Sequence, residues 1–482
     1  MSSNLFWFVV IYLAVSIAVG LIAAVRVHSA RDYITTGRRL PIYVVFAAVF
    51  ATWFGAETVL GISATFVREG LAGLVSDPFG ASLCLVLVGV FFARPLYRMG
   101  LLTIGDFYRR RYSRAVELIA SVCIALSYLG WVSAQVTALG LVFNVLSEGY
   151  ISTGAGMIIG ASVVLAYTLF GGMWSVAITT FVQMIVIILG LLYIAWLVSG
   201  MTGGIGPVVS HAAAQGKFAF WPGLSAAEII AFVAALATMG LGSIPQQDVF
   251  QRVNASKDES TAIYGTILGG VAYFLFAAVP LFLVYAAQMI DPQLVGELMG
   301  RDSQLILPTF IVNHLPLSAQ IVFYGALLSV IMSTASGTLL APSVTIAENV
   351  LKGSREMTDS QFLWLTRAVV VCFAVVVTLY SLWSDATIHK MVENAYKVTL
   401  VAAFVPLAAG IYWRRATAQG ALASSVGGLV TWLAMELLWP ATIVPPQFGG
   451  LLAAFAGMIF GSLLPQWYAP LPDPKCQTHL RQ

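Results

Sequence analysis

Long apolar runs recur along the whole chain and alternate with short polar segments. A bilayer core is about 30 Å thick, so roughly 20 apolar residues in a helix can cross it. Lipid offers no hydrogen-bond partner to a bare backbone, and such segments must therefore be helical. Thirteen spans are predicted, near residues 4–26, 41–65, 75–96, 115–146, 150–168, 175–200, 226–250, 262–288, 318–347, 362–385, 389–413, 417–439 and 447–465. The pattern predicts an all-α integral membrane protein with residues 1–482 as one transmembrane domain.

Composition narrows the function. Hydrophobic residues make up 59% of the chain and charged residues only 9%, whereas soluble domains carry about 25% charged residues. The sequence has no GxxxxGK[ST] phosphate loop and no attached soluble domain, which argues against an ATP-driven pump or a membrane-anchored enzyme. We therefore expect no enzymatic activity, no organic cofactor and no nucleic-acid partner. The expected environment is the lipid bilayer, and the expected state is a monomer or a loose dimer.

Basic residues indicate the orientation in the membrane. The first run, 4–26, lacks a basic segment before it and is followed by arginines, so it is predicted to be a retained helix and not a cleaved signal peptide. With the N-terminus outside, most Lys and Arg residues fall in cytoplasmic loops, including Arg252 and Lys257 after the seventh span. This is the usual bias of membrane proteins. We expect a multi-pass protein of the inner (plasma) membrane with a cytoplasmic C-terminus.

Two spans are interrupted in their interior. The second contains Gly55 and Ala56 within ATWFGAETVLG, and the seventh contains the segment MGLGSIPQQD at 239–248. Glycine and proline weaken the helical ladder, and unwound segments expose carbonyls that can hold a cation. Close packing of small residues is the alternative explanation. The two interruptions lie five spans apart, as expected for two inverted five-helix repeats.

The ninth span carries adjacent hydroxyls, Ser333 and Thr334, in an otherwise apolar stretch. Isolated Ser and Thr in membrane helices usually bond back to their own backbone. Next to a broken helix, however, they could complete an oxygen-only shell that suits a hard cation such as Na⁺.

Three further segments carry a family resemblance: YTLFGGMWS at 167–175, FQRVNASKDESTA at 250–262 and GIYWRRATAQGA at 410–421. Together with the two interruptions they resemble the sodium:solute symporter family over nearly the whole chain. The resemblance implies a leucine-transporter-like core of two inverted five-helix repeats and sodium-coupled uptake of a small organic solute by alternating access. The implied divisions are a leading helix and loop at 1–40, repeats at 41–200 and 226–413, and two trailing helices with a short cytoplasmic tail at 414–482.

The resemblance also implies a single sodium site between the second and ninth spans. Carried over by position, its ligands are the backbone carbonyls of Ala51, Phe54 and Val330 and the hydroxyls of Ser333 and Thr334.

One position departs from many relatives. Thr180 stands where they have an aspartate that is thought to help sodium leave toward the cytoplasm, which places Thr180 on the ion exit path. This departure keeps open a proton-coupled or uncoupled carrier of the same fold. A solute sensor built on a transporter fold is a further alternative.

Aromatic residues indicate where the solute binds. The sequence is most similar to choline transporters around Trp53 and Trp131, which are expected to face a central cavity, and Tyr128, Trp131 and Gln135 share one helical face. Tryptophan pairs suit a quaternary ammonium through cation–π attraction. Choline transporters carry further aromatics where this chain has Ala81 and Gln246, so the aromatic box is incomplete. Packing against neighbouring helices is the alternative role of these tryptophans.

Charges within spans are costly and are therefore candidates for function. Glu57 follows the interruption in the second span, and Lys397 lies within the eleventh. Together they could hold the two ends of a zwitterion such as an amino acid. A carboxylate or a quaternary amine is also possible as the solute. Alternatively, Lys397 pairs with Glu393 one turn earlier on the same helix.

Overall fold

The computed structural model describes residues 3–353, 355–439 and 442–468, and most of them are helical. Within these residues, the only β-type pairing is a single bridge between Leu40 and Ser256. The all-α architecture predicted from the hydrophobic pattern is confirmed. The last residues of the predicted cytoplasmic tail, 469–482, lie outside the described part of the chain.

The helices of the first half are α1 (Ser3–Ala24), α2 (Ala30–Thr35), α3 (Ile42–Trp53), η1 (Glu57–Gly61), α4 (Ile62–Glu69), η2 (Gly70–Leu74), η3 (Val75–Gly80), α5 (Ala81–Leu87), η4 (Val88–Phe92), α6 (Ala93–Met99), α7 (Ile104–Arg111), α8 (Arg114–Leu146), α9 (Thr153–Met201) and α10 (Ile205–Ala214). Those of the second half are α11 (Ala226–Gly242), α12 (Gln247–Ala255), α13 (Glu259–Phe276), α14 (Ala278–Ile290), α15 (Pro292–Arg301), η5 (Ser303–Leu305), α16 (Ile306–His314), α17 (Leu317–Thr345), η6 (Ile346–Lys352), α18 (Asp359–Trp383), α19 (Ile388–Thr399), η7 (Leu400–Phe404), α20 (Val405–Tyr412), α21 (Ala418–Leu438) and α22 (Pro446–Leu463). Here η marks short 3-10 or π-helical segments.

The predicted spans fall on these helices. Among the described residues, ten helices are long and apolar enough to cross a membrane, or eleven if the bent pair α11 and α12 counts as one span. Two predicted spans, 150–168 and 175–200, are joined in α9, which bends at Gly172 (φ 50°). Glycine adopts this left-handed conformation without the steric cost of a side chain. The two helical parts of α9 are therefore joined by a kink at Gly172, with no loop between them.

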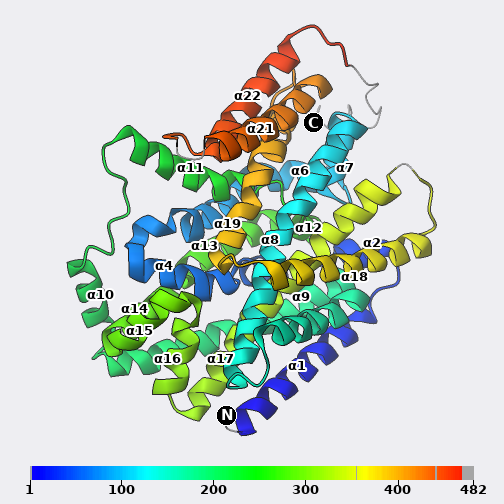
Figure 1. Cartoon of the computed structure of the whole chain (residues 1–482). Coiled ribbons are helices and arrows are strands. Elements are labelled where there is room, and N and C mark those ends of the chain that lie inside the picture. The colour runs from blue at the N-terminus through cyan, green and yellow to red at the C-terminus, as the bar shows by residue number, and fades with distance from the viewer. Residues whose placement is uncertain (1–2, 354, 440–441, 469–482) are drawn as a thin grey trace.

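The centre of the molecule is built around α17. This helix packs against α9, α8 and α3, and α19 lies against α8. Figure 1 shows α1 on the outside of this core next to α9, and α21 and α22 side by side at one end of the molecule. The long helices of the core thus enclose the broken helix α3, where the candidate site lies.

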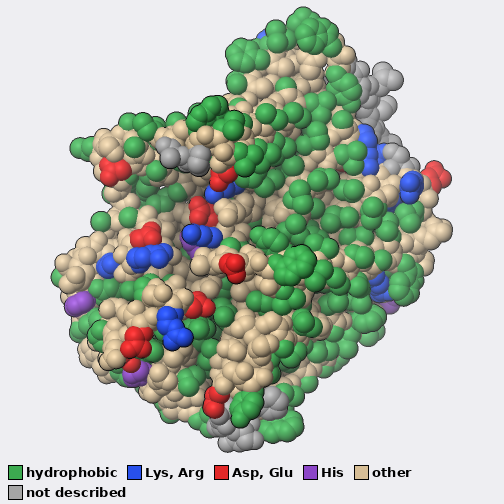
Figure 2. Space-filling model, in the orientation of Figure 1, with side chains coloured by type: hydrophobic (Ala, Val, Ile, Leu, Met, Phe, Trp, Pro, Cys, Tyr) green, Lys and Arg blue, Asp and Glu red, His purple; other side chains and the backbone are tan. Residues whose placement is uncertain are grey.

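The outer surface is suited to lipid. In Figure 2, hydrophobic side chains are spread over much of the face shown, and charged side chains gather over the region of α4, α14 and α15 in Figure 1. Large apolar side chains on the outer helices are exposed, among them Ile22 on α1, Trp196 on α9 and Phe460 on α22. A soluble protein rarely exposes apolar patches of this extent, so the surface agrees with a membrane environment.

Candidate functional site

The second span breaks where the sequence predicted. Helix α3 ends at Trp53, Phe54 has a non-helical conformation (φ −82°, ψ 74°), and helical structure resumes at Glu57. A side chain at Gly55 would lie 2.3 Å from a carboxylate oxygen of Glu57, so glycine is needed for Glu57 to occupy its position. The Gln135 amide oxygen accepts a hydrogen bond from the Ala56 backbone at 3.0 Å. Helix α8 thereby fixes the unwound segment.

The two predicted hydroxyls meet the end of α3. Ser333 Oγ donates to the carbonyl oxygens of Ala51 at 2.7 Å and Val330 at 2.9 Å. Thr334 Oγ1 contacts the same two carbonyls at 3.4 and 3.2 Å. All four residues are fully buried. Phe54 is buried at the end of α3, and in the described structure its carbonyl accepts no hydrogen bond from either hydroxyl.

The chemistry of this oxygen cluster suits a hard cation. It consists of neutral carbonyl and hydroxyl oxygens, which are the ligand types that hard cations prefer. In this structure both hydroxyls donate to the two carbonyls, and a cation bound here would replace those hydrogen bonds. Self-bonding within α17 alone would not involve Ala51, so the contact across the two helices distinguishes the pair from ordinary buried hydroxyls.

Four buried aromatic rings form a second feature, the aromatic cluster of Trp53, Tyr128, Trp131 and Tyr396. The Trp53 ring lies edge-on to Trp131 at 5.6 Å between centroids and stacks on Tyr396 at 6.3 Å. The Trp131 ring contacts Tyr396 at 5.6 Å and stacks on Tyr128 at 6.0 Å. The rings of Trp53 and Trp131 therefore pack against each other, and Tyr396, which sequence reasoning missed, joins them from α19.

A buried ion pair supports this cluster. The Asp248 carboxylate accepts hydrogen bonds from Trp53 Nε1 at 3.2 Å and from the Tyr128 hydroxyl at 2.5 Å. It also lies 3.5 Å from the Arg252 guanidinium. Asp248 was missed as a site residue, although it belongs to the interrupted segment at 239–248, and a charge within a span was the signal that could have identified it.

The predicted placement of Arg252 in a cytoplasmic loop is wrong. Its guanidinium is buried and donates to the Ala48 carbonyl at 3.1 Å, the Asp248 carbonyl at 2.6 Å and Thr52 Oγ1 at 2.5 Å. The reason lies in the second break. Helix α11 ends at Gly242, and α12 leaves at a bend of 44°, which keeps the segment 247–255 inside the protein.

Glu57 lies at the junction of the break and the aromatic cluster. Its carboxylate accepts hydrogen bonds from Trp131 Nε1 at 2.9 Å and Gln135 Nε2 at 2.7 Å, and the residue is 2% exposed. The shared helical face of Tyr128, Trp131 and Gln135 is therefore directed toward carboxylates, with Asp248 at one end and Glu57 at the other.

The remaining predicted solute residues, Gln246 and Lys397, form no hydrogen bond with Glu57 or Asp248 in the described residues. Gln246 is buried at the second break, where its amide nitrogen lies 3.0 Å from Ser127 Oγ and 3.4 Å from Thr399 Oγ1. Lys397 is half-buried, and no ion pair joins it to Glu393 in the described residues. The alternative that these two side chains form a helical pair is therefore not realised in this structure.

Thr180 lies on α9 and is fully buried. Within the described structure its hydroxyl has no hydrogen-bond partner, which is uncommon for a buried polar group. Helix α9 packs against both α3 and α17. Thr180 is thus a buried polar group without a hydrogen-bond partner in the described residues, on a helix that packs against both helices of the oxygen cluster.

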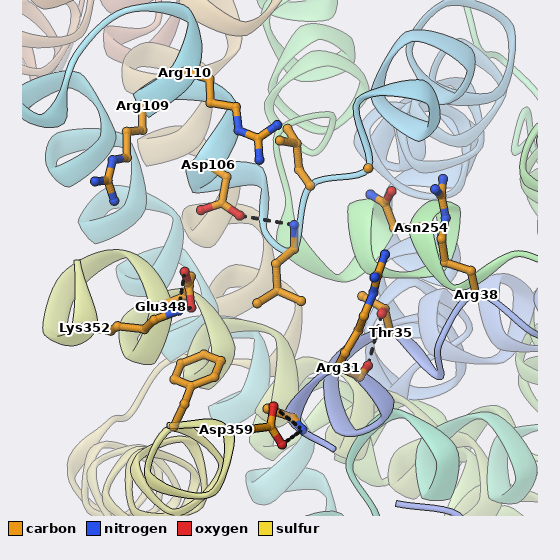
Figure 3. Close-up of a pocket in the computed structure, with 15 residues that line it drawn as sticks. Arg31, Thr35, Arg38, Asp106, Arg109, Arg110, Asn254, Glu348, Lys352 and Asp359 are labelled. Carbon is orange, nitrogen blue, oxygen red and sulfur yellow. Dashed lines mark hydrogen bonds and ion pairs between the residues drawn. The ribbon is translucent and has the colours of Figure 1, made fainter. Parts of the chain in front are cut away.

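Two cavities lie at opposite ends of the broken span. The first has a volume of about 540 Å³ and is lined by Thr35 and Arg38, which precede α3 in the chain. Figure 3 shows Arg31, Arg109 and Arg110 around it. In the same view, acidic groups lie among these arginines; the Asp359 carboxylate accepts from the Ala30 backbone, and Glu348 binds Lys352 at 2.8 Å. The second cavity, of about 660 Å³, is lined by Thr65 and Glu69 at the end of α4 and by His389 and Glu393 on α19. We call it the vestibule.

Comparison with known proteins identifies the family. A model of the sodium:solute symporter family matches residues 33–428. The chain belongs to the sodium:solute symporter family. As a member, it is a multi-pass membrane transporter that couples the movement of a small solute to sodium.

Similar members include carriers of different solutes. The symporter is 27% identical to the high affinity choline transporter 1 of Homo sapiens over 87% of this chain and 75% of the relative. It is 25% identical to the high-affinity proline transporter PutP of Bacillus subtilis (strain 168) over 93% of this chain and 95% of the relative. Since these two names refer to different solutes, membership leaves the solute open.

Solved structures confirm the fold of the symporter. A substrate-bound, outward-open structure of a Na⁺-coupled sialic acid symporter matches with a TM-score of 0.81 at 19% identity, covering 95% of this chain and 96% of that one. Mhp1, a nucleobase-cation-symport-1 family transporter in a closed conformation, matches with a TM-score of 0.62 at 15% identity.

Proposed function

We propose that Na⁺ binds between α3 and α17 and that the solute binds next to it in the aromatic cluster. The proposed ion ligands are the carbonyls of Ala51, Phe54 and Val330 and the hydroxyls of Ser333 and Thr334. The observation that carries this proposal is the contact of both hydroxyls with the Ala51 carbonyl, across two helices that are far apart in sequence.

The proposed coupling follows from the broken helix. Ala51, a proposed ion ligand, and Trp53, a wall of the aromatic cluster, lie two residues apart at the same helix end. A cation that orders this end also orders the tryptophan. The ion and the solute would then each favour the same conformation, which is the requirement for coupled binding.

Alternating access is supported by the two cavities. The described residues that line the vestibule and the cavity at the opposite end include none of the oxygen cluster and none of the aromatic cluster. Both clusters are buried, so the solute can reach them only after a conformational change. We assign the arginine-rich cavity of Figure 3 to the cytoplasmic side, because basic residues are retained there. The N-terminus is then outside the cell.

Transport in proteoliposomes tests the proposed function. The purified protein is tested with a panel of radiolabelled solutes, including choline and proline, under an inward Na⁺ gradient, a K⁺ gradient of equal size and a pH gradient. We expect accumulation of one class of solute only with the Na⁺ gradient. Accumulation driven by the pH gradient, or equal uptake in all three conditions, would favour the proton-coupled or uncoupled alternative. Binding without any uptake would favour a sensor.

Thr180 gives a prediction on the ion path. Thr180→Asp is expected to change the Na⁺ concentration for half-maximal response by about tenfold, because a carboxylate near the cation interacts strongly where the dielectric constant is low. Na⁺-dependent thermal stabilisation of the purified variant measures this. The matched control is Thr179→Val, whose hydroxyl bonds only to its own helix, at the Ser175 and Val176 carbonyls. If Thr180→Asp responds to Na⁺ like the parent, Thr180 does not lie on the ion path.

A further inference from the structure

We infer that the transported solute is a cation and that Asp77, together with Glu57, binds its positive charge. This inference rests on the proposed function and specifies the class of solute. Two observations support it: the excess of acidic over basic side chains among the buried residues of the site, and the position of Asp77 between the vestibule and the aromatic cluster.

Acidic groups outnumber basic groups in the buried centre. Glu57, Asp77, Asp248 and Arg252 are each at most 2% exposed. Arg252 is committed to Asp248, at 3.5 Å between the charged groups. In the described residues, no cationic side chain forms an ion pair with Glu57 or Asp77. Two carboxylates therefore remain for ligands of the site.

Neutral groups hold both of these carboxylates in place. Glu57 accepts from the Trp131 indole and the Gln135 amide. One oxygen of Asp77 accepts from the Tyr273 hydroxyl, which also lies 3.1 Å from Thr58 Oγ1. Because Thr58 follows Glu57 in the chain, Tyr273 links Asp77 to the segment that carries the other carboxylate.

The second oxygen of Asp77 is free to bind a ligand. It is buried and has no hydrogen-bond partner in the described structure. Asp77 lines a small cavity whose other walls include Ser76, His389 and Glu393. These three residues also line the vestibule. An incoming solute would therefore meet Asp77 between the vestibule and the aromatic cluster.

The physical argument is one of charge compensation. A buried carboxylate without a cationic partner is strongly disfavoured, and such groups in membrane proteins mark ligand sites. The Na⁺ held by the neutral oxygen cluster brings one positive charge, so the net charge of the buried centre would still be negative by one. A solute with an ammonium or amidinium group would compensate this remaining charge, and the rings of the aromatic cluster would add cation–π attraction.

A zwitterion is a poorer match. It would need a cationic partner for its own carboxylate, and Arg252 is committed to Asp248. Lys397 is half-buried, and in the described residues it makes no ion pair with any of the central carboxylates. The buried centre therefore has carboxylates that can bind a cationic group, but in the described residues it has no unpaired cationic side chain that can bind the carboxylate of a zwitterion.

A binding experiment with matched probes tests this inference. Thermal stabilisation of the detergent-purified protein is measured in Na⁺ and in K⁺ with choline, ethanolamine, putrescine and agmatine as cations. Glycine betaine and proline are the zwitterions, and 3,3-dimethyl-1-butanol is the neutral analogue of choline. We expect at least one cation to stabilise the protein in Na⁺, and no zwitterion or neutral probe to do so at a lower concentration. Stabilisation by a zwitterion or by the neutral analogue alone, or by no cation in the panel, would overturn the inference.

Variants then locate the site. Asp77→Asn keeps the shape of the side chain, and we expect it to raise the concentration of cation needed for half-maximal stabilisation by about tenfold or more, since a charge-assisted contact is lost. Glu57→Gln is expected to act in the same direction. Glu228→Gln is the matched control, because Glu228 is an exposed acidic residue of the same vestibule. If both central variants keep the response of the parent, the inference fails.

The outcome for Na⁺ separates this inference from the proposed function. Stabilisation by Na⁺ over K⁺ without any probe tests the ion site alone. If Na⁺ stabilises the parent while no cation does, only the inference on the solute fails. If Na⁺ has no effect on the parent, the proposed function fails first.

Discussion

Replacing Arg252 with methionine is expected to destabilise the protein by about 3–5 kcal/mol, because the change leaves the buried Asp248 carboxylate without its cationic partner. The guanidinium also connects three helices. It binds Ala48 and Thr52 on α3 and Asp248 on α12. Helix α17 passes so close at Gly337 that a methyl group there would lie 2.5 Å from the guanidinium. The loss is measured as a drop in apparent melting temperature and in the monodisperse fraction of detergent-purified protein.

A second substitution separates charge from packing in this prediction. Arg252→Met combined with Asp248→Asn removes both charges, and we expect it to recover a large part of the lost stability. The control is Arg94→Met on α6, whose side chain is 60% exposed and pairs with Glu259 at 2.7 Å. An exposed pair contributes about 0–1 kcal/mol, so this control should change stability little. If the double variant is no more stable than Arg252→Met, the charge of Asp248 is not the cause.

Loss of one hydroxyl from the oxygen cluster is expected to have the largest effect on the sodium response. Ser333→Ala and Thr334→Ala each remove one proposed ligand from a fully buried site. A lost polar contact in such a site costs roughly 1–3 kcal/mol. This corresponds to an increase of about 5- to 150-fold in the Na⁺ concentration needed for half-maximal stabilisation. The measurement is thermal stabilisation as a function of Na⁺ concentration, since a ligand that binds only the native state stabilises it.

A buried serine on the same helix provides the control for this experiment. Ser343 is fully buried and donates to the Leu339 carbonyl of its own helix at 2.8 Å. Ser343→Ala should therefore leave the sodium response as it is in the parent. If Ser333→Ala and Thr334→Ala also respond like the parent, the cation is not bound by these hydroxyls.

The sequence was sufficient for the fold, and it indicated the two breaks next to which the sodium site is proposed. Apolar periodicity and length determine which segments cross a membrane, and Gly55 and the Gly–Pro segment at 239–248 marked both breaks because they weaken the helical ladder. The contact between Ser333 and Ala51 followed from the family resemblance, since no local pattern joins residues so far apart in the chain.

The charge balance of the site required the structure. The sequence placed Arg252 in a loop because a cation after a span is usually cytoplasmic, and only the bend before α12 shows that it is buried with Asp248. Asp77 was missed although it lies near the start of the predicted span 75–96, where a charge within a span was the signal that could have identified it. Tyr396 has no local feature that separates it from other interfacial aromatics. These residues became candidates only when the packing of α8, α12 and α19 was known.

Equilibrium binding of radiolabelled ²²Na⁺ to the purified protein tests the sodium site most directly, since it needs no knowledge of the solute. We predict saturable binding to the parent that unlabelled Na⁺ displaces and K⁺ does not, and we predict that the folded double variant Ser333→Ala with Thr334→Ala has lost it. Saturable binding of equal strength in the parent and in the double variant would contradict the placement of the ion between α3 and α17.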